Sequence, residues 1–288
     1  MYVRPFDYLR VDSLEAASQA LIEQGPGSWV IAGGQSLMPL LNVGLAEVDI
    51  LVDISRVRGY ADVTYTNELI EIGALATHRT LEKDAAITTG APLLAAAIGH
   101  IGNVRVRNVG TIGGSVAHND PAGEVPLVLA VLGATYRLDR GVDTRSVAAA
   151  HFTKGSFETV LSRGELVATV SLPPTQLGSG WGFHEFAYRP GDFAVAAAAA
   201  TARIQDEVVA DLHLGVTGLG GGPLRCRSFE EAALGAAPAD LAGLEHLISS
   251  DFGYVADSVE SSAYRSHLAT VMAGRAVADA VRRSMAAA

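Results

Sequence analysis

The stretch from Gly110 to Glu124, GTIGGSVAHNDPAGE, constrains this chain most. Four glycines, two hydroxyl residues and a group of polar residues lie there between apolar runs. Because glycine has no Cβ, consecutive backbone N–H groups can turn toward a ligand without steric hindrance. The composition is typical of a backbone surface curved around a ligand, and we expect neither a strand nor a helix here.

A second glycine stretch lies upstream, Ala32–Leu37 (AGGQSL), directly after the apolar run Trp29–Ile31. A strand that opens into Gly-Gly-polar-Ser often presents N–H donors and a hydroxyl to a phosphate, although a single glycine pair also occurs in plain turns. Two such stretches together predict binding to both sides of a long anionic ligand. Neither matches the G-x-G-x-x-G fingerprint or carries the lysine of a P-loop, which disfavours an ordinary NAD site and a P-loop hydrolase.

These motifs carry a family resemblance. AGGQSL at 32–37, RNVGTIGGS at 107–115 and the following NDP at 119–121 resemble the FAD-binding medium subunits of the molybdenum hydroxylases. That family includes carbon monoxide dehydrogenase, the xanthine dehydrogenases and bacterial N-heterocycle dehydrogenases. The opening Pro5–Tyr8 and the later Gly191–Ala194 also match, so the resemblance covers nearly the whole chain.

The resemblance implies an α+β protein, with a two-lobed, PCMH-like α/β FAD-binding domain followed by a C-terminal flavoprotein domain. We expect the FAD-binding domain at 1–177, with lobes of about 1–56 and 57–177, and the second domain at 178–288. The boundary falls in the proline- and glycine-rich segment 173–180.

Residue patterns add detail to this expectation. Ser13 is a predicted N-cap for a helix that Gly25 ends, Thr77 is predicted to cap a helix from His78, and another helix is predicted over 92–100. In the C-terminal domain the patterns predict a three-stranded antiparallel sheet (182–188, 194–204 and 208–216) and three helices (228–234, 239–248 and 261–285).

The resemblance also assigns site residues. Both glycine loops would hold the diphosphate of FAD through Ala32, Gly33, Gly34, Gln35, Ser36, Leu37, Thr111, Gly113, Gly114 and Ser115. Glu124 would bind a hydroxyl of the sugar or ribityl portion, with Asp120 as the second candidate, although an acidic residue near a helix start can also simply offset the helix dipole. Ile101 would lie against the adenine and Phe193, where some relatives have tyrosine, near the isoalloxazine; either could equally be core. No catalytic side chain and no metal ligand is predicted.

Charge and cysteine content limit the partners. The chain has 21 basic and 31 acidic residues, a net charge of −10, which disfavours nucleic acid and anionic membranes. No apolar run reaches the ~18–20 residues of a membrane helix and the N-terminus lacks an apolar signal core, so we expect no membrane span and a cytoplasmic location. Cys226 is the only cysteine, so an iron–sulfur cluster would have to be held by a partner subunit.

By resemblance, the chain would carry FAD and receive electrons from substrate oxidation at a molybdenum cofactor in a large subunit, through 2Fe–2S clusters in a small subunit. An external acceptor would reoxidise the flavin, and the assembly would be a dimer of heterotrimers. Two other hypotheses are a self-sufficient FAD oxidase of the vanillyl-alcohol-oxidase type and a non-enzymatic pyrophosphate-binding module.

Overall fold

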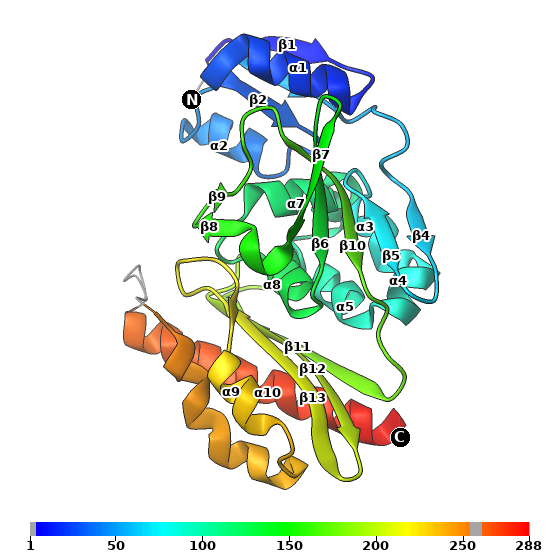
Figure 1. The fold of residues 1–288 in the computed structure, drawn as a ribbon. Coiled ribbons are helices and arrows are strands. Elements are labelled where there is room, and N and C mark those ends of the chain that lie inside the picture. Colours follow the sequence, from blue (N-terminus) through cyan, green and yellow to red (C-terminus); the bar gives the residue numbers. More distant parts are fainter. Residues whose placement is uncertain (1–3, 254–260, 288) are drawn as a thin grey trace.

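The computed structural model of the protein describes residues 4–253 and 261–287. Its three larger sheets are stacked along the long direction of the molecule (Figure 1). The N-terminal residues form the upper layer, the middle of the chain forms the central layer, and the C-terminal residues form the lower one. Among the helices of the described residues, none is long and apolar enough to cross a membrane.

The upper layer is a parallel sheet in the order β1 (Asp7–Arg10), β3 (Ile50–Asp53) and β2 (Ser28–Ile31). Helix α1 (Leu14–Gln24) buries its apolar side on one face, and α2 (Leu37–Val43) packs on the other. The Ser13 hydroxyl accepts a hydrogen bond from the N–H of Ala16, and Gly25 follows the helix at φ 74°. The predicted capping of this helix is therefore confirmed.

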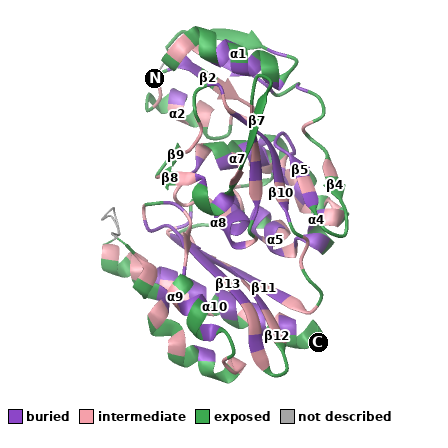
Figure 2. Cartoon of the chain, in the orientation of Figure 1, coloured by how far each residue is buried: buried purple, intermediate pink, exposed green. Residues whose placement is uncertain are grey.

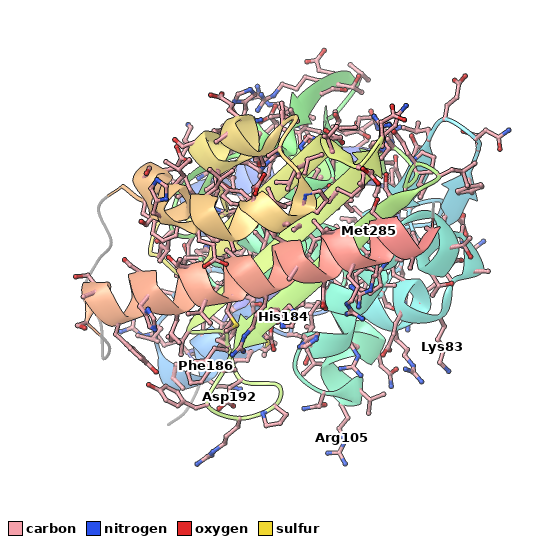
Figure 3. The ribbon with its side chains drawn as sticks, turned by 90° about the horizontal axis from the view of Figure 1, so that it is seen from below. Lys83, Arg105, His184, Phe186, Asp192 and Met285 are labelled. Atoms are coloured by element: carbon pink, nitrogen blue, oxygen red, sulfur yellow. The ribbon has the colours of Figure 1, made fainter. Side chains whose placement is uncertain are left out.

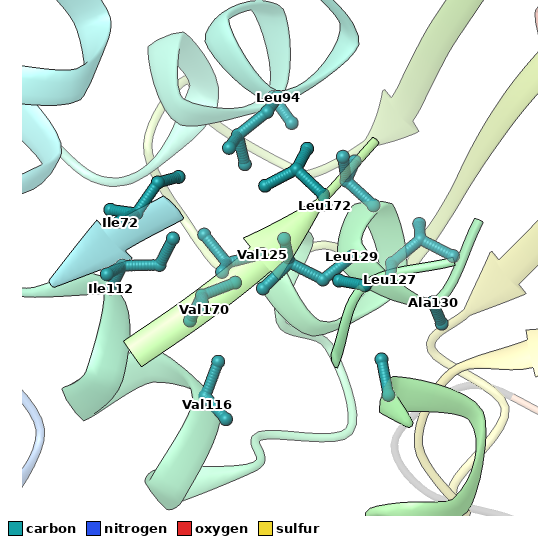
Figure 4. Close-up of a cluster of buried hydrophobic side chains, with 14 of the residues drawn as sticks. Ile72, Leu94, Ile112, Val116, Val125, Leu127, Leu129, Ala130, Val170 and Leu172 are labelled. Carbon is teal, nitrogen blue, oxygen red and sulfur yellow. The ribbon is translucent and has the colours of Figure 1, made fainter. Parts of the chain in front are cut away.

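The central layer is a five-stranded antiparallel sheet. Its order is β4 (Val63–Tyr65), β5 (Ile70–Gly73), β10 (Leu166–Leu172), β6 (Thr135–Arg140) and β7 (Asp143–Ala148). Six helices pack with it: α3 (His78–Lys83), α4 (Ala85–Gly90), α5 (Pro92–His100), α6 (Val104–Val109), α7 (Ile112–His118) and α8 (Glu124–Val131). Figure 4 shows their shared core, in which Ile112 of α7 and Leu127 of α8 lie with Val170 of β10. A small hairpin, β8 (Thr153–Gly155) and β9 (Glu158–Thr159), follows the short 3₁₀ turn Ala149–His151.

The lower layer is an antiparallel sheet of β11 (Ser179–Phe186), β12 (Ala196–Gln205), β13 (Val208–Thr217) and β14 (Leu224–Arg225). The long helix α10 (Ser262–Ala287) crosses one face of it (Figure 3). Helix α9 (Arg227–Ala233) and a 3₁₀ helix, η3 (Pro238–Asp251), complete the domain.

Much of β12 is buried (Figure 2), and its alanines are buried on both faces of the sheet. Ala196, Ala198 and Ala200 pack with α10, whereas Ala197 and Ala199 join the core of the central layer. A Cβ on Gly180 or Gly182 of β11 would overlap backbone atoms of α10. Small residues therefore let helices approach this sheet closely from both sides.

The structure corrects several predictions. Residues 112–118 are helical, although neither a helix nor a strand was expected between residues 110 and 124, and residues 104–109 just before them are helical as well. The C-terminal sheet has a fourth strand of two residues, because the chain after the glycine-rich turn at 218–222 returns to pair with β13. The helix expected at 239–248 is part of the 3₁₀ helix η3. The division of the chain at 177/178, with lobes of 1–56 and 57–177, stays a prediction.

Candidate functional site

The first glycine motif follows β2 and leads into α2. Within the described residues, the N–H groups of Gly33, Gly34, Gln35 and Ser36 donate no hydrogen bond, although the Gly34 carbonyl accepts one from the N–H of Met38 at 3.0 Å. Gly34 has φ 68°, a backbone conformation that favours glycine. Successive unpaired N–H groups form a concave donor surface of the kind that binds anions.

The second glycine motif is different, because it builds helix α7. Thr111 is the N-cap, and its hydroxyl accepts a hydrogen bond from the N–H of Gly114 at 3.1 Å. The other amides of this turn are also used inside the protein: Ile112 donates to Ala76, Gly113 to Ala74 and Ser115 to the Thr111 carbonyl. Of the backbone donors expected at 111–115, the N–H groups of residues 112–115 are therefore already paired, and this motif offers the hydroxyls of Thr111 and Ser115 instead.

Close packing explains why α7 contains two adjacent glycines. A Cβ on Gly113 would lie 2.5 Å from the Cβ of Ala74, so any side chain here would push the helix away from the end of β5. Gly114, in contrast, has only the Thr111 hydroxyl near its Cβ position, at 2.9 Å. Tertiary packing thus overrides the low helix propensity of glycine.

The two motifs also touch each other. A Cβ on Gly33 would overlap the carbonyl oxygen of Val109, just before the second motif. The loop of the upper layer therefore rests directly on the backbone of the central layer. This contact brings segments about 75 residues apart into one site.

A cavity of about 680 Å³ opens between the layers at this contact. Its size falls in the range of about 300–1,000 Å³ that is common for small-molecule and cofactor sites. All fourteen residues that the resemblance assigns to FAD line it: Ala32, Gly33, Gly34, Gln35, Ser36, Leu37, Ile101, Thr111, Gly113, Gly114, Ser115, Asp120, Glu124 and Phe193. The structure thus brings the whole predicted set together, while the contacts of each residue with FAD stay predictions.

His78, a residue that the sequence reasoning did not assign, supports the second motif from behind. It lines the cavity, is buried, and its Nε2 lies 3.0 Å from the Ser115 hydroxyl. Burial, with the nearby Arg107 guanidinium adding to it, lowers the pKa of His78 to about 4. At neutral pH its imidazole is therefore neutral. Only its place after the predicted cap Thr77 was visible in the sequence.

Acidic groups stand at the start of α8. Burial, together with the charges of Glu185 and Asp120, raises the pKa of Glu124 to about 7. Asp120 accepts a hydrogen bond from the N–H of Ala122 at 2.8 Å and lies 3.9 Å from Nε2 of His118. A carboxyl that only offset a helix dipole would have a lowered pKa, whereas the pKa of Glu124 is raised.

The segments that carry Ile101 and Phe193 lie at the same end of the cavity. A Cβ on Gly191 would lie 2.6 Å from the carbonyl oxygen of Gly102, so the loop before Phe193 rests on the turn after α5. Figure 3 shows this loop at Asp192 on the same side of the molecule as α6 at Arg105. The geometry does not favour the expected placement of Ile101 and Phe193 at opposite rings of an extended FAD.

Phe157, at the tip of the β8–β9 hairpin, is a second residue that the sequence reasoning missed. It lines the cavity, is 56% exposed, and has φ 58°, which is rare for a bulky side chain. Its ring lies 5.1 Å from that of His118. Asn119 fixes the hairpin by donating to the carbonyls of Gly155 and Glu158. No local sequence pattern marks this arrangement.

The residues present fit FAD. A diphosphate needs hydrogen-bond donors, and the first motif supplies unpaired N–H groups while the second supplies hydroxyls. Flat rings need apolar surface, which Trp29, Ile101 and Phe193 provide along the same cavity. No group of three or more His, Cys, Asp or Glu side chains in the described part of the chain could hold a metal ion.

Comparison with known proteins agrees with this site. A family described as "FAD binding domain in molybdopterin dehydrogenase" matches residues 4–175. A second, described as "CO dehydrogenase flavoprotein C-terminal domain", matches residues 181–280. The chain therefore belongs to the FAD-binding proteins of the molybdopterin dehydrogenases.

Individual relatives narrow this class. The chain is 35% identical to the 6-hydroxypseudooxynicotine dehydrogenase complex subunit alpha of Paenarthrobacter nicotinovorans, over 97% of this chain and 95% of the relative. It is 30% identical to the nicotine 6-hydroxylase medium subunit of the same organism, over 96% of this chain and 100% of the relative. The structure superimposes on a chain of carbon monoxide dehydrogenase from Hydrogenophaga pseudoflava with a TM-score of 0.94 at 27% identity, covering 98% of this chain and 99% of that one. The protein is thus an oxidoreductase subunit of the medium, FAD-carrying type of the molybdenum hydroxylases.

Proposed function

We propose that this subunit accepts electrons released by substrate oxidation at a molybdenum cofactor in a large partner subunit, through 2Fe–2S clusters in a small partner subunit, and passes them to an external acceptor. We further propose a dimer of such heterotrimers and a cytoplasmic location. The single cysteine supports the need for an iron–sulfur partner, because a 2Fe–2S cluster takes four cysteine thiolates.

The observation that carries this proposal is the cavity at the contact between the glycine motifs. It combines unpaired N–H donors at 33–36 with the hydroxyls of Thr111 and Ser115. Electron relay needs a cofactor that is held firmly and oriented, and the protein supplies binding, orientation and electrostatics. When bound, FAD would supply two-electron redox chemistry at this position.

This chain's own residues would have distinct tasks. The amides of Gly33 to Ser36 would bind the diphosphate, and Thr111 and Ser115 would donate to it from the opposite wall. Neutral His78 would hold the Ser115 hydroxyl in place without adding charge. Because the segments of Ile101 and Phe193 are in contact, we propose that both flank one ring system, the isoalloxazine, rather than one ring each.

A self-sufficient oxidase of the vanillyl-alcohol-oxidase type remains the alternative, and the pyrophosphate-binding module a weaker one. Such oxidases often tether FAD covalently through histidine or cysteine. Cys226 does not favour tethering, because it is buried and outside the cavity lining. His78 and His118 are the histidines that line the cavity.

The test is an absorption spectrum and a denaturing gel of the complex purified from its native host. Flavin bands, broad iron–sulfur absorption and two co-purifying chains, one larger and one smaller, support the relay. Flavin on this chain alone, with the flavin retained by the protein after acid precipitation, would establish the self-sufficient oxidase instead. A colourless single chain would contradict both.

A further inference from the structure

We propose that Glu124, Glu185 and His100 form a redox-linked protonation cluster: when bound FAD receives two electrons, Glu124 takes up one proton from water, and the charges of Glu185 and His100 set the pH range in which it does so. This inference rests on the proposed function. It concerns residues that belong to both domains expected from the sequence, since Glu124 begins α8, His100 ends α5 and Glu185 lies on β11.

The cluster has one group at the cavity and one pair that reaches the solvent. Glu124 lines the cavity. The Oε1 of Glu185 lies 3.0 Å from Nδ1 of His100. The side chain of Glu185 is only 9% exposed, whereas that of His100 is 45% exposed. His100 therefore connects a buried carboxylate with bulk water.

Glu185 has capacity for a further hydrogen-bond donor. Within the described residues, its Oε2 is buried and has no hydrogen-bond partner. An unsatisfied carboxylate oxygen in such a place costs free energy, which suggests a role beyond packing. Phe183, two residues earlier on β11, holds the imidazole of His100 at a ring distance of 5.0 Å.

The charges around Glu124 make its protonation sensitive to its surroundings. It interacts with Glu185 on β11, with Asp120 in the loop before α8 and with His100 at the end of α5. The two carboxylates raise its pKa and His100 lowers it, while burial contributes most and brings the pKa to about 7. Negative charge added to a cofactor in the same cavity would raise this pKa further.

The step balances in electrons and protons. The reduced iron–sulfur partner supplies two electrons, one proton is taken up by the flavin ring, and one by Glu124. The two added negative charges are then matched by two protons. On reoxidation by the acceptor, both protons return to water.

The test is the pH dependence of the flavin midpoint potential, measured by spectroelectrochemistry on the FAD-loaded complex. For a two-electron couple each proton taken up contributes about 30 mV per pH unit. We expect the slope to steepen from about 30 to about 59 mV per pH unit as the pH rises through about 7. Glu124→Gln should keep the shallower slope throughout. A wild-type slope that stays constant or becomes shallower as pH rises would overturn the proposal.

Two variants outside the cavity lining give opposite, diagnostic shifts. Glu185→Gln removes a negative neighbour and should move the change of slope to lower pH, whereas His100→Gln removes a positive one and should move it to higher pH. His184→Gln is the matched control, because His184 neighbours Glu185 on β11 but pairs with Asp279 of α10. Equal shifts in both variants, or the same shift in the control, would indicate a structural effect and contradict the proposal. A wild-type complex that contains no FAD would instead contradict the proposed function.

Discussion

The two glycine motifs look alike in sequence but have different structural roles. In the first, at 33–36, the backbone N–H groups have no acceptor among the described residues. In the second, at 111–115, the amides from Ile112 onward are all used inside the protein, and the glycines allow α7 to pack on Ala74. Glycine can therefore expose the backbone to a ligand or bring two backbones together, and composition alone does not tell which.

The comparison is tested most severely at Gly33. This residue both exposes its backbone N–H and allows two backbones to pack closely. Gly33→Val would place a Cβ inside the Val109 carbonyl oxygen, so the upper layer must move away from the central layer. We expect loss of FAD together with a loss of about 1–3 kcal/mol in the free energy of unfolding, as for other overpacked sites. Urea unfolding and the ratio of flavin to protein absorbance measure the two effects. Unchanged stability would contradict the close contact of the motifs.

The largest effect on FAD affinity alone is expected at Gly114, whose Cβ position meets only the Thr111 hydroxyl. Gly114→Val should lower FAD affinity more than about tenfold, equivalent to about 1.4 kcal/mol, while the apoprotein loses no more than the roughly 1 kcal/mol of the Thr111 cap. Gly99→Val is the control, since Gly99 has open space around its Cβ position and lies outside the cavity lining. Stoichiometric FAD in Gly114→Val would contradict binding of the cofactor against α7.

Local signals explain how much of this could be predicted from sequence. The caps at Ser13 and Thr77 and the helix at 92–100 rest on interactions between neighbours in the chain, and all three are present. Helix α7 was not predicted, because its Gly113 is needed for close packing against Ala74, which lies nearly forty residues away in the sequence. The raised pKa of Glu124 likewise depends on burial and on Glu185, which no spacing near residue 124 reveals. The sequence therefore predicts which residues come together in the site, but not which of their hydrogen-bonding groups remain unpaired there.

The second motif should also be sensitive to acid, because buried His78 supports it. The pKa of His78 is about 4 in the folded protein against 6.5 without burial, so the unfolded state binds a proton first as pH falls. The stability that depends on a neutral His78 is complete above pH 6.5 and is lost progressively as the pH falls toward 4. At pH 5 the free energy of unfolding is lower by roughly 2 kcal/mol for this reason.

His78→Gln removes this titration. We expect the free energy of unfolding of the apoprotein to fall by roughly 2 kcal/mol more between pH 7 and pH 5 in the wild type than in the variant. Urea unfolding at both pH values gives the difference. His184→Gln serves as control, because that side chain is one-third exposed. Parallel curves for wild type and His78→Gln would show that His78 is not held neutral.

The smallest expected effect separates capping from ligand binding. Thr111 and Thr77 are both N-caps whose hydroxyls accept a hydrogen bond, from Gly114 and Thr80 respectively, each at 3.1 Å. Thr111 lines the cavity and Thr77 does not. Replacement of either by valine keeps the shape but removes the cap, so each variant should lose about 1 kcal/mol of stability.

FAD affinity should distinguish the two variants. Thr111→Val removes a hydroxyl that we propose donates to the diphosphate, whereas Thr77→Val leaves the cavity lining intact. Titration of the apoproteins with FAD should therefore show weaker binding in Thr111→Val only. Equal affinities at equal stability would mean that the hydroxyl of Thr111 serves only as the N-cap of α7, and that the first motif alone provides the diphosphate donors.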